Sequence, residues 1–171
     1  MIQEEKQLLL KDLCARLPYD VKGRVYAETT NGEYDINGDM IFFNSPFDVT
    51  LDDINTSTEE IHVIAIGNED TVDFIEDQQI DGKPYTIDEF KPYLRPMSSM
   101  TEEERKEYEN LFEYEEREYN QGCCFYDEYK IDIDDEYRLT TVIDWLLEHH
   151  FDFRCLIEKG LALEAPEDMY K

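Results

Sequence analysis

The sequence lacks any long hydrophobic run. Its first eighteen residues hold an apolar run of only three leucines with charges on both sides, which is shorter than the apolar segment of a secretion signal. No segment approaches the roughly twenty apolar residues that span a bilayer. We therefore expect a cytoplasmic protein that does not enter membranes.

Positive charge is also scarce. The 171 residues include 43 Asp and Glu but only 16 Lys and Arg, which gives a formal net charge of -27. Nucleic-acid affinity and attraction to anionic membranes both depend largely on cationic groups, so direct binding to either is disfavoured. Basic protein surfaces and multivalent cations remain as partners.

Cysteine is too sparse to suggest a disulfide framework. There are four Cys, two of them adjacent at Cys123 and Cys124, and reduced thiols fit the cytoplasm. The zinc-binding spacings C-x-x-C and H-x-x-x-H are absent, and the neighbours His149 and His150 would point about 100° apart on a helix. The sequence therefore predicts no metal ion and no cofactor.

Catalytic motifs are missing as well. G-x-S-x-G and phosphate-cradling glycine loops do not occur, and the acidic run at residues 132–136 lacks the central glycine and closing Glu of a calcium loop. Asp144, His149 and Cys155 could form a nucleophilic set, although any chain with four Cys and three His offers such a combination. A small enzyme or metal-binding protein that uses Cys and His near the C-terminal helix stays as the alternative function.

The chain does contain enough apolar material for a core. It is 41% hydrophobic and includes nine Phe and twelve Tyr, and its length is common for one domain. The apolar periodicity divides it into a strand-rich part over about 18–84 and a helical part over about 86–171. We expect a single α+β domain over residues 1–171.

The first half predicts an N-terminal helix followed by short strands. Residues 2–17 show helical periodicity. The pairs Asn31-Gly32 and Asn37-Gly38 predict two tight turns, and Ser45-Pro46 predicts a break. Strands are expected at residues 21–28, 34–36, 40–43, 47–51, 61–66 and 72–75. Their close spacing predicts a curled antiparallel sheet or a small barrel.

The second half predicts two longer helices. Thr101 and Glu104 have the spacing of a capping box, which opens a helix to about Tyr119. Another helix begins near Tyr137, and Trp145 is expected at the margin of the core. Its apolar stripe consists of Leu139, Val142, Ile143, Leu146 and Leu147. Residues 91–100 are expected to form an ordered connector, and residues 123–133 an extended segment.

The helix that starts after Thr101 is more acidic than helix stability requires. Its carboxylates are Glu102, Glu103, Glu104, Glu107, Glu109, Glu113, Glu115, Glu116 and Glu118. Such a row could imitate phosphates and occupy the nucleic-acid-binding groove of another protein. The simpler interpretation is that the charge only keeps the protein soluble. We predict a non-catalytic acidic protein that binds a basic partner.

Two stretches also resemble known proteins. Residues 91–104, KPYLRPMSSMTEEE, and residues 150–171, HFDFRCLIEKGLALEAPEDMYK, resemble uncharacterised proteins of gut bacteria, which are often encoded in prophages and other mobile elements. The resemblance covers the second half of the chain. It implies a bacterial cytoplasm and a phage or mobile-element context, and it brings no catalytic or binding residue. In that context we expect the acidic binding protein to act as an accessory or inhibitor.

Overall fold

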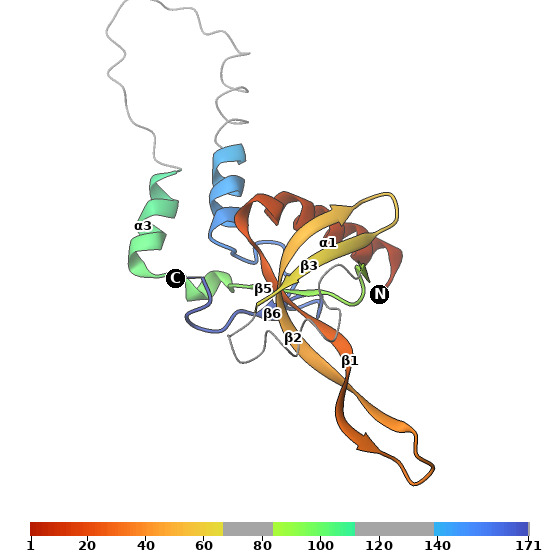
Figure 1. Cartoon of the computed structure of the whole chain (residues 1–171). Coiled ribbons are helices and arrows are strands. Elements are labelled where there is room, and N and C mark those ends of the chain that lie inside the picture. Colours follow the sequence, from red (N-terminus) through yellow and green to blue (C-terminus); the bar gives the residue numbers. More distant parts are fainter. Residues whose placement is uncertain (67–83, 112–138, 171) are drawn as a thin grey trace, which may run out of the picture.

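The structure is a computed structural model that describes residues 1–66, 84–111 and 139–170. These residues form a mixed α+β fold, as the sequence predicts (Figure 1). The elements are α1 (Gln3–Arg16), η1 (Leu17–Tyr19), β1 (Lys22–Tyr34), β2 (Met40–Asn55), β3 (Glu60–Ala65), β4 (Tyr85–Thr86), β5 (Lys91–Leu94), η2 (Met97–Ser99), α3 (Glu102–Asn110) and β6 (Leu163–Glu164). A further helix covers residues 139–148.

The strands form one six-stranded sheet in the order β4-β3-β2-β1-β5-β6. Neighbouring strands are antiparallel except β5 and β6, which are parallel. The sheet curls, and α1 lies against it (Figure 1). The predicted curled sheet is therefore present, but it is mixed and not purely antiparallel, because β6 comes from a distant part of the chain.

The main core lies between α1 and the sheet. Leu9 and Leu13 are one helical turn apart on α1, and both are fully buried. Val49 and Leu51 of β2 are two residues apart and face the same core, as does Ile61 of β3. The apolar face of α1 thus packs on the apolar face of the sheet. This packing stabilises the N-terminal helix, whose prediction is confirmed.

The hairpin between β1 and β2 turns at only one of the two predicted sites. In the turn at residues 35–39, the Asp35 carboxylate accepts hydrogen bonds from the backbone N–H groups of Asp39 and Asn37, which lower its pKa. Gly32 has a φ of 78° but lies beside a register shift inside β1. The first Asn-Gly pair therefore forms a bulge, and the predicted turn there is wrong.

Strand β2 continues through the predicted break at Pro46. The N–H of Leu51 donates to the carbonyl of Val21, so odd-numbered residues of β2 point their backbone groups toward β1. Even-numbered residues point the other way, as Asp48 does when it accepts from Ile66. The nitrogen of Pro46 therefore faces the edge of β2 on which β3 pairs. Because that pairing begins only at Val49, the proline costs the sheet no hydrogen bond.

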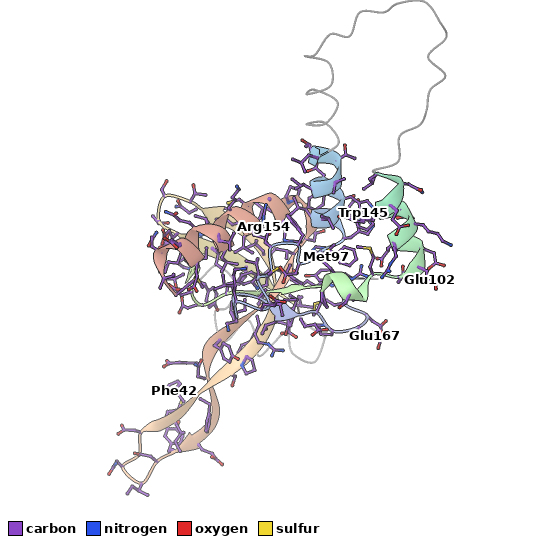
Figure 2. The ribbon with its side chains drawn as sticks, turned by 180° about the vertical axis from the view of Figure 1, so that it is seen from behind. Phe42, Met97, Glu102, Trp145, Arg154 and Glu167 are labelled. Atoms are coloured by element: carbon purple, nitrogen blue, oxygen red, sulfur yellow. The ribbon has the colours of Figure 1, made fainter. Side chains whose placement is uncertain are left out.

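A second apolar cluster joins α3 to the 139–148 helix (Figure 2). Val142, Leu146 and Phe151 are buried there, and the half-buried rings of Trp145 and Tyr108 pack against them. Trp145 lies at the margin of this cluster, in agreement with its predicted position. The 139–148 helix is therefore held by side chains of its predicted apolar stripe.

The prediction of a helical second half is not confirmed. Residues 91–100, expected to be a connector, contain β5 and η2, and residues 151–170 form turns and β6. Strand β5 exists because β1 and β6 pair with it, and neither partner is visible in the local pattern. The remainder of the predicted helix after Asn110 and the predicted segments at 72–75 and 123–133 lie outside the described residues.

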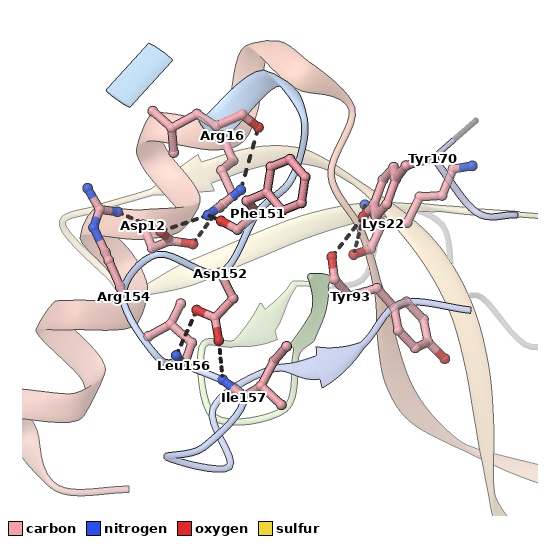
Figure 3. A network of polar contacts seen from close by, with 11 residues as sticks. Asp12, Arg16, Lys22, Tyr93, Phe151, Asp152, Arg154, Leu156, Ile157 and Tyr170 are labelled. Atoms are coloured by element: carbon pink, nitrogen blue, oxygen red, sulfur yellow. Dashed lines mark hydrogen bonds and ion pairs between the residues drawn. The ribbon is translucent and has the colours of Figure 1, made fainter. Parts of the chain in front are cut away.

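Tyr170 closes one end of the seam between β1 and β5. Its hydroxyl accepts a hydrogen bond from the Lys22 N–H at 3.0 Å and donates to the Tyr93 carbonyl at 2.9 Å (Figure 3). Burial raises the pKa of Tyr170 to about 12, so the hydroxyl keeps the proton that it donates. The backbone of Lys22 thereby gains a partner on the side that faces away from β2.

Candidate functional site

A long two-stranded ribbon projects from the body of the protein. We call it the arm and define it as residues 26–46, which include parts of β1 and β2 and the turn between them. Figure 1 shows the arm extending away from α1 and from the rest of the sheet. Its exposed large apolar side chains are Tyr26, Tyr34, Ile36, Met40, Phe42 and Phe43. Phe42, labelled in Figure 2, is 57% exposed.

The arm carries charge of one sign only. Glu28, Glu33, Asp35 and Asp39 supply four carboxylates, and residues 26–46 contain no Lys or Arg. Fully burying one large apolar side chain contributes about 1.5–3 kcal/mol, a gain that the exposed rings of the arm leave unused. Exposed apolar groups gathered on one element mark interaction sites more often than chance. Here they are combined with negative charge.

Beside Tyr26 and Glu28 of β1 and beside Phe42 and Asn44 of β2, the described residues place no further strand on the outer edges of the arm. Strand β5 pairs with β1 only at Gly23 and Arg24, and the pairing of β2 with β3 begins at Val49. Unpaired strand edges are templates for another extended chain. The arm therefore offers backbone hydrogen-bonding groups as well as side chains.

A pocket of about 590 Å³ lies at the base of the arm. It is lined by Tyr26, Ala27, Glu28, Phe42, Phe43, Asn44, Asp88, Glu89 and Lys91. Three of these side chains are aromatic and three are carboxylates, whereas Lys91 is the one cation in the lining. Aromatic faces and carboxylates both attract cationic groups, so the lining suits a Lys or Arg side chain better than an anion.

The three carboxylates of the pocket differ in whether other residues already bind them. Asp88 is ion-paired with Lys6, and Glu89 accepts hydrogen bonds from the N–H and hydroxyl of Thr86. Glu28 is exposed, and within the described residues no hydrogen bond or ion pair engages its carboxylate. Glu28 is therefore the carboxylate of this pocket that is available to a ligand.

The predicted acidic row is only partly within the described residues. Glu102, Glu103, Glu107 and Glu109 are exposed on α3, whereas Glu113, Glu115, Glu116 and Glu118 lie outside the described ranges. Figure 2 shows Glu102 on the side of α3 away from Trp145. Four of the nine predicted residues thus face solvent on one helix.

Glu104 has a structural role. Its two carboxylate oxygens accept hydrogen bonds from Nη1 and Nη2 of Arg95 at 2.7 and 2.8 Å, and it also caps α3 through the Thr101 N–H. These bonds, the Arg95 bond above all, lower the pKa of Glu104 to about 2. Glu104 ties α3 to the strand side of the molecule, and a partner would have to displace Arg95 to use it.

A buried charge network joins α1 to the segment after the 139–148 helix (Figure 3). Asp12 and Arg16 are completely buried, with Arg16 Nε 2.7 Å from Asp12 Oδ2. Arg154 Nη1 lies 2.6 Å from Asp12 Oδ1, and Arg16 Nη2 donates to the Phe151 carbonyl at 2.7 Å. Both charges of the buried pair are matched, so the network is a structural joint with no free group for chemistry.

The alternative function required His and Cys side chains to converge near the C-terminal helix. His149 stacks on Trp145 with ring centroids 4.1 Å apart, and its Nδ1 lies 2.9 Å from the Trp145 carbonyl. Cys155 is exposed, and within the described residues no hydrogen bond joins it or Asp144 to His149. No group of three potential metal ligands occurs in the described ranges, outside which Cys123 and Cys124 lie.

His150 is buried where the 139–148 helix ends. It has a φ of 58° and its ring stacks on Tyr170 at 3.7 Å, while the N–H of the next residue, Phe151, reaches back to the Leu146 carbonyl. This is a helix-ending turn that usually takes glycine. Burial, assisted by nearby cations such as Arg16, lowers the pKa of His150 to about 3. His150 is therefore neutral and packs as an aromatic ring.

No family model, curated protein or solved structure matches the chain. Within the described residues, no helix combines the length and the apolar character that crossing a bilayer requires. The arguments about function below therefore rest on the geometry and charge of this chain.

The sequence predictions did not select the arm as a binding site. The alternation at residues 21–28 predicts a half-buried strand, and residues 34–36 and 40–43 are predicted only as further short strands. A signal was present nevertheless: the segment from residue 25 to residue 47 contains five aromatic and four other large apolar residues among four acids, without one Lys or Arg. Absence of cations beside aromatic residues is the feature that could have drawn attention to it.

Proposed function

We propose that this protein is a non-catalytic binding protein that docks onto a basic protein surface through the arm. The observation that carries the proposal is the composition of the arm, in which exposed rings and four carboxylates stand clear of the body without a single cation. Aromatic side chains are enriched at interfaces, and complementary charge steers a partner into register. A basic surface with apolar patches would match both properties.

The proposal includes a role as an accessory or inhibitor in a phage or other mobile element of a bacterium, acting in the cytoplasm. The resemblance of residues 91–104 and 150–171 supports that context. In a more specific version, the exposed glutamates of α3 imitate phosphates and occupy a nucleic-acid-binding groove. Glu103 and Glu107, one turn apart on α3, support that version because their exposed carboxylates repeat along one helical face.

The test begins with capture of partners from lysate of the native host on immobilised protein, with washes at low and high salt. A captured basic protein is then purified, and its Kd is measured for the wild type and three variants. One variant changes the arm, Glu28→Lys with Phe42→Ser, and one changes α3, Glu103→Lys with Glu107→Lys. Glu158→Lys is the control, because Glu158 is exposed and far from the arm in the chain.

We expect the arm variant to lose at least tenfold in affinity and the wild-type complex to weaken with salt, since screening reduces exposed charge pairs. Loss in the α3 variant alone would favour phosphate imitation over arm docking. Equal affinity for all variants would contradict the proposal. The same measurement with Cys155→Ser and His149→Gln tests the alternative of an enzyme or metal protein, for which these residues would matter.

A further inference from the structure

The open edge of β1 at the base of the arm has a defined geometry. The Lys22 N–H points away from β2, toward Tyr170, and Arg24 pairs with Lys91 on the same side. Because backbone groups alternate along a strand, Tyr26 and Glu28 point theirs in the same direction. Beyond Lys91 no described strand meets that edge. Tyr170 closes one end of the β1–β5 seam, and the other end is open.

The pocket lies at this open end. Asp88, Glu89 and Lys91 line it together with residues of β1 and β2, so it continues the line that β5 follows beside β1. Its volume of about 590 Å³ is within the range of pockets that take several side-chain groups. An extended segment placed there would lengthen the sheet beyond Lys91, the residue at which β5 begins.

The side chains around this edge select a cation. The register pairs Glu28 with Asn44, which places Tyr26 and Phe42 on the same face, one on each side of Glu28. A Lys or Arg side chain at this position would contact two aromatic rings and an available carboxylate. Lys91 and Arg24 would repel a cation placed nearer the body, so the cation is positioned beside Glu28.

We propose that the edge of β1 at Tyr26 and Glu28 accepts an extended basic segment of the partner as an added strand, with one Lys or Arg of that segment between Tyr26, Glu28 and Phe42. This inference rests on the proposed function and specifies how the arm binds. Strand addition supplies main-chain hydrogen bonds for affinity and side-chain positions for specificity. A second copy of the arm fits poorly, because pairing two arms would place carboxylates against carboxylates.

The test uses a nine-residue peptide of alternating Lys and Thr with blocked ends as the probe. In such a peptide all Lys amides lie on one edge and all Thr amides on the other. Two isomers are made, each with four N-methyl groups, either on four Lys amides or on four Thr amides. Their charge is identical, but each isomer lacks the N–H donors of one edge. Binding to the full chain is measured by fluorescence anisotropy at low salt.

Strand addition predicts that one N-methylated isomer binds at least tenfold more weakly than the other. It also predicts that bound peptide slows hydrogen exchange of the Tyr26 and Glu28 amides. In the protein, Glu28→Pro should weaken binding more than Glu28→Gln, because only proline removes the outward N–H. Pro46 of β2 also has its nitrogen on an outer edge of the arm. A proline at position 28 should therefore be compatible with the two-stranded ribbon.

Equal affinities of the two isomers, together with loss of binding in Glu28→Gln, would overturn strand addition and leave charge-driven docking by the arm in place. Absence of binding by any basic peptide, with an arm variant that also keeps its affinity for the captured partner, would overturn the inference and the proposed function together. Unchanged hydrogen exchange at Tyr26 and Glu28 in a saturated complex would by itself contradict the added strand.

Discussion

The Asp12–Arg16 joint and the arm differ in which side chains they bury: the joint buries charged groups, and the arm exposes apolar ones. The joint buries two charges completely and pairs both, whereas the arm leaves large apolar side chains in water and Glu28 without a partner in the described part of the chain. Burying charges and exposing rings both cost free energy relative to the ordinary arrangement. In the joint the cost is offset within the chain, and in the arm it would be offset only by a partner.

The largest expected effect comes from breaking the joint. Arg16→Met leaves the buried Asp12 carboxylate with Arg154 alone, and removal of one partner of a buried pair costs about 3–5 kcal/mol. Urea unfolding followed by circular dichroism measures the change. Lys11→Met on the exposed side of the same helix is the control, and we expect it to change stability by less than about 0.5 kcal/mol. A similar small value for Arg16→Met would mean that the joint is dispensable.

The next effect concerns the seam below the arm. A Cβ at Gly23 would lie 2.3 and 2.4 Å from Cζ and Cε2 of the Phe90 ring and 2.8 Å from the Lys91 carbonyl oxygen. Gly23→Ala should therefore destabilise the protein by about 3 kcal/mol through overpacking. Gly160→Ala is a useful comparison, since nothing crowds that position and only its φ of 69° opposes the change. Thermal unfolding that ranks Gly160→Ala as the worse substitution would contradict the packing argument.

The pH dependence of stability tests the burial of His150. The pKa of His150 is lowered from 6.5 to about 3, so the unfolded chain binds a proton between those values and the folded chain does not. Stability from His150 is thus complete above pH 6.5 and is lost as the pH falls toward 3, with a loss of about 2 kcal/mol between pH 7 and pH 5.

The control for this prediction is His150→Gly, which accepts the φ of 58° and cannot titrate. Urea unfolding of both proteins at pH 7 and pH 5 isolates the contribution of His150, because the many carboxylates titrate in both. The wild type should lose about 2 kcal/mol more than the variant. Parallel losses in the two proteins would show that His150 is protonated in the folded state.

The smallest expected effect lies on the arm. Phe42→Ser removes an exposed ring and should change the free energy of unfolding by less than about 0.5 kcal/mol. Val49→Ser lies on the same strand at a fully buried position and should cost about 2–4 kcal/mol. Urea unfolding of the two variants measures the contrast within β2. Strong destabilisation by Phe42→Ser would assign the arm to the fold and not to a partner.

Local patterns predicted the elements whose causes are local. The helix α1 and the turn at Asn37-Gly38 follow from apolar spacing and from the backbone freedom of Asn-Gly, both of which are visible within a few residues. The continuation of β2 through Pro46 was missed because a proline breaks a strand only if its missing N–H faces a partner. That depends on where β3 ends, which the residues around Pro46 do not reveal.

The site was harder to predict than the fold for a related reason. Asp12 and Arg16 have the i, i+4 spacing of a surface ion pair, and only the arrival of residues 151–154 makes them buried. Phe43 has the same strand parity as the buried Val49, and it is exposed because the covering layer does not extend over the arm. In both cases the burial of a side chain is decided by parts of the chain that are remote in sequence.

The joint also has a consequence for how the chain is made. Arg16 emerges early in synthesis, but the carbonyl of Phe151 that it binds is 135 residues further along. Translation proceeds at roughly 5–20 residues per second, so the Phe151 carbonyl is synthesised about 7–27 seconds after Arg16. During this interval the buried pair of the first helix lacks the segment that later covers it, although the strands that pack on Leu9 and Leu13 are made earlier. The N-terminal segment must therefore remain soluble on the ribosome without its eventual neighbours, and its glutamates and lysines suit that early period.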